Sequence, residues 1–236
     1  MKRKYVVSAG DFGLIPGSPI AYWLSDKEKE SFKVGAPLSD YADCCTGMQT
    51  GNNGKYIRFW HEVEYIKTQL YSNQGKWFKY NCGGESRKWY GNYYNLVNWD
   101  ENGHEIRNEK SSVIRNEKQF FNEGITWKRI SSGSFSFRYL PPEFIFDQAG
   151  DSMFAKNKKL LLYIIAFVNS KVAYKLSECI SPTLNLTAGN MVKMPLIEDK
   201  EKRAEIEVLA SGCIEACKED WDAFEVSWDF KKHPLL

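Results

Sequence analysis

The stretch GKWFKYNCGGESRKWYGN, residues 75–92, decides how the rest of the chain is interpreted. Four basic residues alternate in it with five aromatic residues, and four glycines interrupt the run. Cations neutralise phosphates, aromatic rings stack on bases or sugars, and glycines let the backbone approach a ligand closely. The same pattern is typical of a two-stranded ribbon with core aromatics and solvated lysines. The stretch therefore predicts β-structure, and it leaves a structural ribbon and a nucleic-acid contact both open.

The composition is that of an ordinary globular protein whose charge is unevenly distributed. Its 236 residues fit one large domain, or one domain with an appendage, and 43% apolar residues suffice for a core. A net charge of +2 excludes a generic polyanion binder. Residues 51–138 carry 14 basic against 9 acidic side chains, whereas residues 139–236 carry 12 against 15. A basic middle and an acidic end predict one face for an anion and another for a different partner.

The six cysteines and three histidines predict neither a disulfide framework nor a metal site. Cys44 and Cys45 are adjacent, Cys213 and Cys217 are one helical turn apart, and the histidines are scattered. Reduced thiols and a cytoplasmic location are expected, without a metal. We find no signal region and no membrane span, and both ends of the chain look cut from something longer.

Turn signals and hydrophobic alternation predict many short strands. A capping box at Ser25 and Glu28 begins a helix that ends near Lys33. Residues 105–107 follow an Asn-Gly turn signal and should pair with the preceding strand, while residues 125–139 form a second hairpin. Segments 10–19, 46–54 and 181–190 are expected to be loops, 62–71 partly helical, and 110–122 a short helix or a loop. The expected strands are residues 5–7, 41–45, 55–60, 94–99, 105–107, 125–130, 134–139, 143–146 and 191–196.

Two longer helices complete the prediction. Residues 158–179 form the clearest helix, capped by Asn157 and buried on more than one side. Residues 199–224 form a charged amphipathic helix with a narrow apolar stripe. The residues expected to be buried on it are Ile206, Leu209, Cys213, Ala216, and Trp221 or Phe224. Short strands with two good helices predict an α+β (mixed α/β) fold.

No catalytic residues are expected. The chain has no Walker loop, no Gly-x-Gly-x-x-Gly after a strand and no Gly-x-Ser-x-Gly elbow. The trio Glu198-Asp199-Lys200 imitates a nuclease motif, but acidic residues at the start of a helix are favoured by the helix dipole. Cys82 has no neighbouring histidine that could activate it.

Several segments of the chain together carry a resemblance to a known family. They include the loop 47–53, the strand 58–63, and the central stretch 76–91 with its Gly83-Gly84 pair. The remaining segments are residues 97–108, 125–138, 169–171, 181–185 and 228–234. Over roughly residues 20–236 the chain resembles the region after the catalytic domain in adenine-specific DNA methyltransferases of the BREX phage-defence type, the PglX family. It is more distantly similar to target recognition domains of type IIG restriction-modification enzymes and type I specificity subunits.

The resemblance implies the DNA-reading part of a methyltransferase without its catalytic half. Such enzymes carry an S-adenosylmethionine glycine motif and an Asn-Pro-Pro-Tyr motif, and this chain has neither; its Pro141-Pro142 pair is flanked by Leu140 and Glu143. The resemblance therefore implies no cofactor in this chain and S-adenosylmethionine in the catalytic domain of its parent. It implies a target-recognition-domain-like sheet with packed helices over residues 1–197. Residues 198–236 would form a helical segment that packs on this domain or on a partner.

The partners implied are double-stranded DNA, the parent's catalytic domain and other defence-system subunits, without a membrane. Basic side chains of the middle would hold phosphates, while amides would read base edges. The candidate DNA-binding residues are Gln49, Asn52, Asn53, Lys55, Arg58, Lys76, Lys79, Arg87, Lys88, Trp89, Tyr90, Asn92, Lys128 and Arg129. Two alternatives stay open: a protein-interaction module of a defence complex, and a carbohydrate-binding module that stacks sugars on its aromatics.

Overall fold

The computed structural model describes residues 25–72, 74–131, 133 and 135–236. The strand expected at residues 5–7 and the loop at 10–19 lie outside the described residues. The capping box is confirmed: Ser25 Oγ accepts from the Glu28 amide at 3.4 Å, and the Glu28 carboxylate accepts from the Ser25 amide at 2.7 Å. It begins helix α1 (Asp26–Val34), which ends at Gly35.

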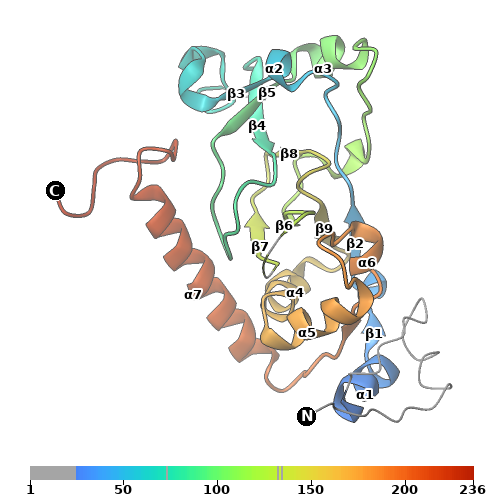
Figure 1. The fold of residues 1–236 in the computed structure, drawn as a ribbon. Coiled ribbons are helices and arrows are strands. Elements are labelled where there is room, and N and C mark those ends of the chain that lie inside the picture. Colours follow the sequence, from blue (N-terminus) through green and yellow to red (C-terminus); the bar gives the residue numbers. More distant parts are fainter. Residues whose placement is uncertain (1–24, 73, 132, 134) are drawn as a thin grey trace, which may run out of the picture.

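The first sheet has the strand order β2-β9-β6-β7, with every pair antiparallel (Figure 1). Its strands are β2 (Ala42–Cys45), β6 (Gly124–Trp127), β7 (Phe137–Leu140) and β9 (Ser152–Ala155). The hairpin expected over residues 125–139 is confirmed as the β6–β7 pair. Strand β9 was not expected, because its four residues are nearly all buried and show no alternation to signal a strand.

The second sheet has the order β3-β5-β4-β8, and β4 and β8 run parallel. Its strands are β3 (Ile57–Phe59), β4 (Trp77–Asn81), β5 (Asn95–Asn98) and β8 (Ile145–Phe146). Around it lie the helices α2 (Asn53–Tyr56) and α3 (Asp100–Arg107) and the short 3-10 turns η3 (Trp60–Glu62), η4 (Tyr65–Lys67) and η5 (Glu117–Gln119).

The strand expected at residues 105–107 is wrong. Glu101, Asn102 and Gly103 adopt left-handed backbone angles, but the chain then continues as a helical turn that buries Ile106. Both edges of β5 are already paired, with β3 and β4, so no place remains for a hairpin partner. The tertiary burial of one isoleucine overrides the turn signal here.

The helix expected at residues 158–179 is broken in two. The 3-10 turn η6 (Lys158–Leu160) leads into α4 (Leu161–Val168), and α5 (Lys171–Ile180) follows after a bend of 81°. Ser170 caps α5 by accepting from the Ala173 amide at 3.0 Å. Asn157 caps the start as expected, accepting from the Lys159 amide at 3.1 Å.

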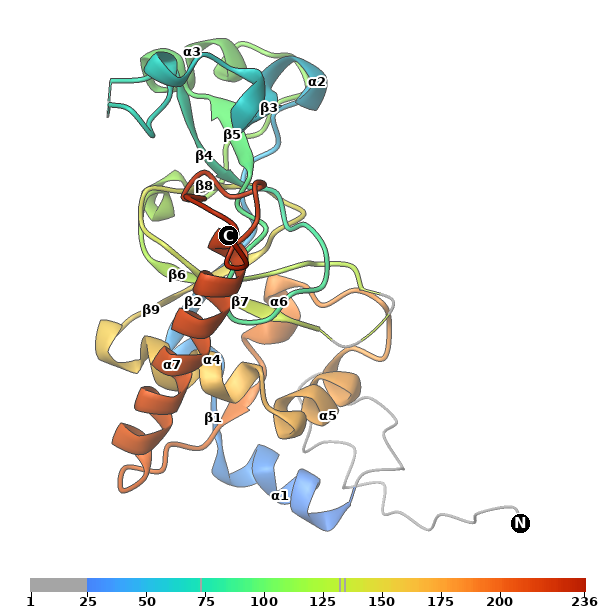
Figure 2. The same cartoon turned by 90° about the vertical axis from the view of Figure 1, so that its left-hand side faces the viewer.

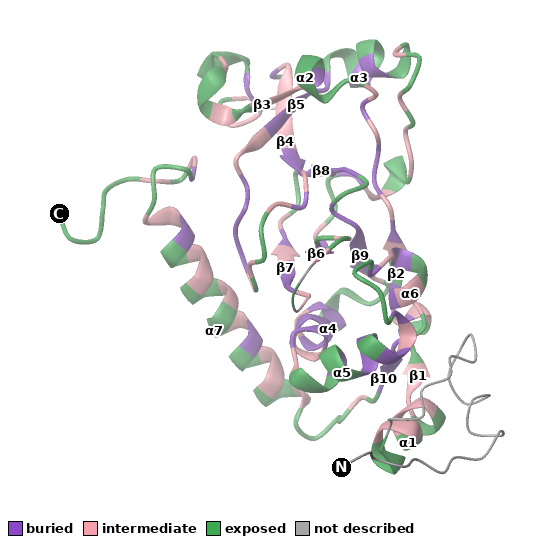
Figure 3. Cartoon of the chain, in the orientation of Figure 1, coloured by how far each residue is buried: buried purple, intermediate pink, exposed green. Residues whose placement is uncertain are grey.

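The rest of the chain closes the fold around two hydrophobic clusters. One cluster lies between the first sheet and α4–α5, and the other lies against the second sheet, as the purple regions of Figure 3 show. Helix α7 (Arg203–Asp222) contributes to both, with Ala210 in the first and Trp221 in the second. Helix α7 packs against α4, and Figure 1 and Figure 2 show it running from there toward the second sheet. The remaining elements are β1 (Ala36–Pro37), which pairs with β10 (Pro195–Leu196), η2 (Leu38–Asp40) and α6 (Ala188–Met191).

The expected α+β class is confirmed, but the stripe expected on the last helix is partly wrong. Leu209 is 63% exposed, and Cys213 and Ala216 are exposed as well. Trp221 is buried as expected and Ile206 is half-buried, while the face that packs inward also carries Ala210. Among the described residues no single helix is long and apolar enough to cross a membrane, and α4 with α5 passes that test only as a bent pair.

Candidate nucleic-acid interface

The central stretch 75–92 serves mainly to hold the fold together. Only its first part is a strand, β4, and the rest is an irregular loop in which Tyr90 is buried. Trp89 is half-buried and exchanges backbone bonds of 2.8 Å with the first sheet. Asn92 is 7% exposed and donates its amide to the Glu85 carbonyl at 2.8 Å. These three candidates therefore have structural partners.

Arg87 is a candidate whose side chain makes several contacts within the protein. Its guanidinium forms an ion pair with Asp220 of α7 and lies 5.2 Å from the centre of the Trp221 ring. Its Nε also donates to the Tyr90 carbonyl at 3.0 Å. The residue ties the loop to α7, so its side chain is committed within the molecule.

A second group of candidates lies around α2 and α3. Lys55 and Lys76 both reach Glu105, at 3.6 and 3.8 Å, so one carboxylate serves two ammonium groups. The Asn52 side chain caps α2 and the Asn53 side chain accepts from Thr50, whereas the hydrogen bonds of Gln49 to Val113 involve its backbone and leave its side chain uncommitted within the described residues. Arg58 donates to the carbonyls of Gly54 and Ile57, and Lys79 pairs with Glu143 at 2.6 Å.

The structure leaves Lys88 on a different face, beside two adjoining cavities, and Lys128 and Arg129 follow β6 shortly before Ser131, which lines one of them. A cavity of about 210 Å³ is lined by Lys88, Lys171 and Tyr174, and one of about 400 Å³ is lined by Ser131 and Thr183. Phe135 and Tyr174 line both cavities, so the two form one concave surface. We call this surface the α5 face. It joins cations, aromatic side chains and hydroxyls, which are groups that grip a nucleic-acid backbone, and it also includes the Glu178 carboxylate in the larger cavity.

Of the four cations that we consider for the α5 face, two form no ion pair within the described residues and two interact with other groups of the protein. Lys128 and Lys171 are exposed and form no ion pair within the described residues. Lys88 is exposed and donates to the Asn169 carbonyl at 3.0 Å, at the end of α4. Arg129 is half-buried, and its charge counteracts the burial that raises the pKa of Asp151. A hydrogen bond with Glu178, together with the charge of that carboxylate, raises the pKa of Tyr174.

Sequence reasoning missed several residues of this face, namely Phe135, Lys171, Tyr174 and Thr183. All four lie outside the basic central stretch that directed attention to residues 75–92. The available signals were the segments 169–171 and 181–185, which belong to the family-like set but carry little charge. Folding brings them together with residues 128–135 because the loop before α6 runs beside the end of β6.

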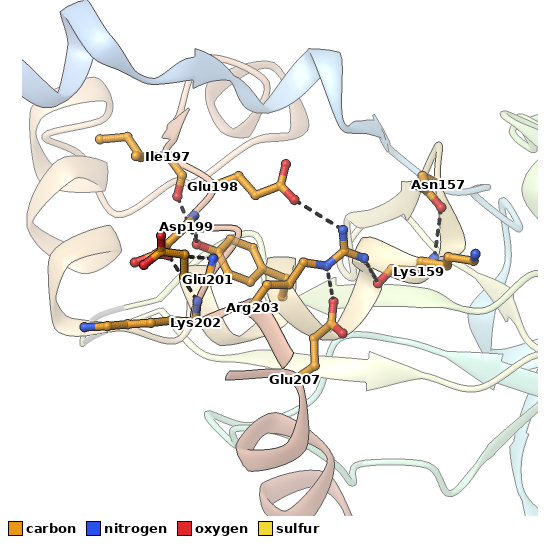
Figure 4. A network of polar contacts seen from close by, with 10 residues as sticks. Asn157, Lys159, Ile197, Glu198, Asp199, Glu201, Lys202, Arg203 and Glu207 are labelled. Carbon is orange, nitrogen blue, oxygen red and sulfur yellow. Dashed lines mark hydrogen bonds and ion pairs between the residues drawn. The ribbon is translucent and has the colours of Figure 1, made fainter. Parts of the chain in front are cut away.

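The carboxylate-lysine trio at Glu198 is part of a helix start, as Figure 4 shows. Asp199 accepts from the Glu201 and Lys202 amides at 3.0 and 3.1 Å, just before α7 begins. Arg203 holds Glu207 at 2.7 Å and Glu198 at 3.2 Å. Within the described residues, no three His, Cys, Asp or Glu side chains are grouped so as to hold a metal ion.

The glycine pair of the chain does not form a cofactor loop. A Cβ on Gly83 would lie 2.9 Å from the Ala149 carbonyl oxygen, and one on Gly84 would lie 2.8 Å from the Asn92 side chain. These glycines let parts of the protein approach each other, and no helix begins at them. The residues present therefore do not fit the glycine motif that S-adenosylmethionine would need.

The fold and the α5 face define a mixed α+β domain with a concave, cation-lined surface. Nearly the whole chain is homologous to part of two adenine-specific methyltransferases. It is 39% identical over 246 residues to adenine-specific methyltransferase PglX of Lacticaseibacillus casei (strain Zhang), covering 98% of this chain and 20% of that protein. It is 40% identical over 230 residues to adenine-specific methyltransferase BrxX of Escherichia coli O9:H4 (strain HS), covering 96% of this chain and 18% of that protein. The chain thus spans about a fifth of the length of these relatives, and no family model matches it.

Proposed function

We propose that this chain is the DNA-recognition part of an adenine-specific DNA methyltransferase of the PglX type. The observation that carries the proposal is the homology of nearly the whole chain to one fifth of such methyltransferases. The chain lacks the Asn-Pro-Pro-Tyr and cofactor motifs, so methyl transfer from S-adenosylmethionine belongs to the parent's remaining region. The partners of the proposal are double-stranded DNA, that catalytic region and other subunits of the defence system.

The α5 face is the surface that we assign to DNA. Lys88 and Lys171 line one cavity, and Lys128 and Arg129 follow β6 shortly before Ser131, which lines the other. Ammonium groups at such positions fix the register of a duplex through its phosphates. Lys55 and Lys76 near α2 and α3 are weaker candidates because both pair with Glu105, which neutralises part of their charge.

The test replaces Lys88 and Lys171 together by glutamine, which removes both charges and keeps a hydrogen-bond donor. Binding to a short random-sequence duplex is followed by fluorescence anisotropy between about 50 and 200 mM salt. Each phosphate contact contributes about 0.9 to the slope of log affinity against log salt, so the slope should fall by about 2.

The matched control is Lys200→Gln with Lys202→Gln, two exposed lysines at the start of α7. The control should leave affinity and slope unchanged, since it alters net charge equally but lies away from the α5 face. Equal losses in both variants would contradict the assigned face. Absence of salt-dependent DNA binding by the unsubstituted chain would contradict the function itself.

A further inference from the structure

Two separate segments form a short antiparallel ribbon at the edge of the α5 face. Ile130 and Asn185 are paired as a β-bridge. The Ser131 amide donates to the Leu184 carbonyl at 3.0 Å, and the Leu186 amide donates to the Arg129 carbonyl at 2.9 Å. We call residues 129–131 and 184–186 the Asn185 ribbon. In Figure 2 the chain that follows β6 and the chain that precedes α6 run beside each other here.

Hydrogen bonds to the rest of the protein hold the backbone of the ribbon in place. Leu186 is fully buried, and its carbonyl accepts from the Trp127 indole at 2.7 Å. The Asn185 carbonyl accepts from the Ser181 hydroxyl at 2.6 Å, and the Asn185 amide donates to the Thr183 hydroxyl at 3.3 Å. Both backbone groups of Asn185 are therefore held, and its side chain projects from an ordered position.

The side chains of the ribbon are left facing outward. Paired residues of an antiparallel bridge point to the same side, so Ile130 and Asn185 share one face of the ribbon. Ile130 is 57% exposed, and the exposed side-chain amide of Asn185 makes no hydrogen bond within the described residues. Ser131 and Leu184 point to the other side, where they line the cavity of about 400 Å³.

The side chains of Asn185 and Ile130 have the chemistry needed to recognise an A·T base pair. An asparagine amide forms two bonds with the N6 and N7 edge of adenine, and an aliphatic side chain contacts the thymine methyl group. A two-stranded ribbon also fits the major groove. Lys128 is exposed and stands two positions before Ile130, so we expect it to hold a flanking phosphate.

Other amides are less suited to this role. The side chains of Asn52, Asn53 and Asn92 already bond to groups of their own chain. We propose that Asn185 and Ile130 read an A·T base pair of the target from the major groove. The inference rests on the proposed function, because it names how the same domain would recognise sequence. The two side chains project from the edge of the α5 face, on the side of the ribbon opposite the cavity.

The experiment is selection from a random duplex library by the full chain, followed by sequencing of the bound pool. The unsubstituted chain should enrich an A·T pair at one position by about 5- to 150-fold, the range of one good bidentate contact. Asn185→Ala should lose that preference while keeping its affinity for unselected DNA. Replacing thymine by uracil at that position should weaken binding of the unsubstituted chain but not of Ile130→Ala.

Val172→Ala is the control, because Val172 is 58% exposed on α5 and outside the ribbon. It should leave the selected sequence unchanged. The inference is overturned if the unsubstituted chain binds duplexes without sequence preference, or if Asn185→Ala selects the same DNA sequence as the unsubstituted chain. The proposed function would stand in either case. If the chain binds no DNA at all, the proposed function fails first.

Discussion

Asp147, directly after β8, is a buried carboxylate. Asp147 is 8% exposed, and its Oδ1 accepts from the amides of Ala149 and Gly150 at 2.7 and 3.0 Å. Burial is the main cause that raises the pKa of Asp147 to about 6, against its ordinary value of 3.8. The two backbone bonds offset only part of this cost.

The pKa of Asp147 predicts a definite pH dependence of stability. Between about pH 4 and 6 the folded chain still holds a proton on Asp147 that the unfolded chain has released. The contribution of this group to the free energy of unfolding therefore falls as pH rises, by about 3 kcal/mol at most. Asp147→Asn keeps an oxygen acceptor and does not titrate, so this fall should disappear.

Urea unfolding of both forms between about pH 4 and 7 measures the effect. The difference in the free energy of unfolding should grow in favour of Asp147→Asn as pH rises. Two parallel curves would show that Asp147 titrates alike in the folded and unfolded chains.

At the scale of elements, the break between α4 and α5 depends on one amide. Asn169 is 8% exposed, accepts from the Phe137 amide at 3.1 Å and donates to the Phe137 carbonyl at 3.0 Å. The bend thus fastens the helices to the end of β7. It also sets Lys171 and Tyr174 beside Lys88 on the α5 face.

Asn169→Ala should destabilise the fold because the buried Phe137 amide loses its acceptor. The expected loss is about 1–3 kcal/mol in the free energy of unfolding by urea. Asn185→Ala is the matched control, since the exposed side chain of Asn185 bonds to nothing in the described chain, and its effect should lie within about 0.5 kcal/mol. Similar losses from both substitutions would contradict the structural role given to Asn169.

The elements show which parts of the fold a single sequence predicts. Capping at Ser25 and Asn157 and the β6–β7 hairpin follow from local chemistry, and all three are confirmed. The helix break was also signalled, because Asn169-Ser170 is a typical start for a new helix. The misplaced strand at residues 105–107 and the missed β9 depend on distant contacts, which local patterns do not contain.

At the scale of the whole molecule, the candidate site was harder to predict than the fold class. The basic central stretch pointed to residues 75–92, yet Arg87 faces Asp220, which lies 133 positions away in sequence. Such an ion pair neutralises a charge that the amino-acid composition alone would count as free to bind a ligand. Conversely, the α5 face combines Lys88, Ser131, Tyr174 and Thr183 from four separate segments, and no local window contains that combination.

Helix α7 joins the two hydrophobic clusters, and Trp221 is its anchor in the second. Trp221 is 7% exposed, lies under the Arg87 guanidinium at 5.2 Å and approaches the Tyr94 ring at 6.0 Å between centres. Ala210, three turns earlier, packs into the first cluster. The helix therefore couples the stability of the two sheets.

Trp221→Ala should cost about 3–5 kcal/mol, the range for removing a buried large aromatic side chain, and should loosen that coupling. Hydrogen exchange measures both effects, because it reports the opening of β4–β5 and of β6–β7 separately. We expect the amides of the second sheet to lose more protection than those of the first, which keeps its packing on α4. Phe224→Ala is the control, since this aromatic is 51% exposed just beyond α7 and should change neither sheet. Equal loss of protection in both sheets would mean that the molecule opens as one unit and that α7 does not link two separable halves.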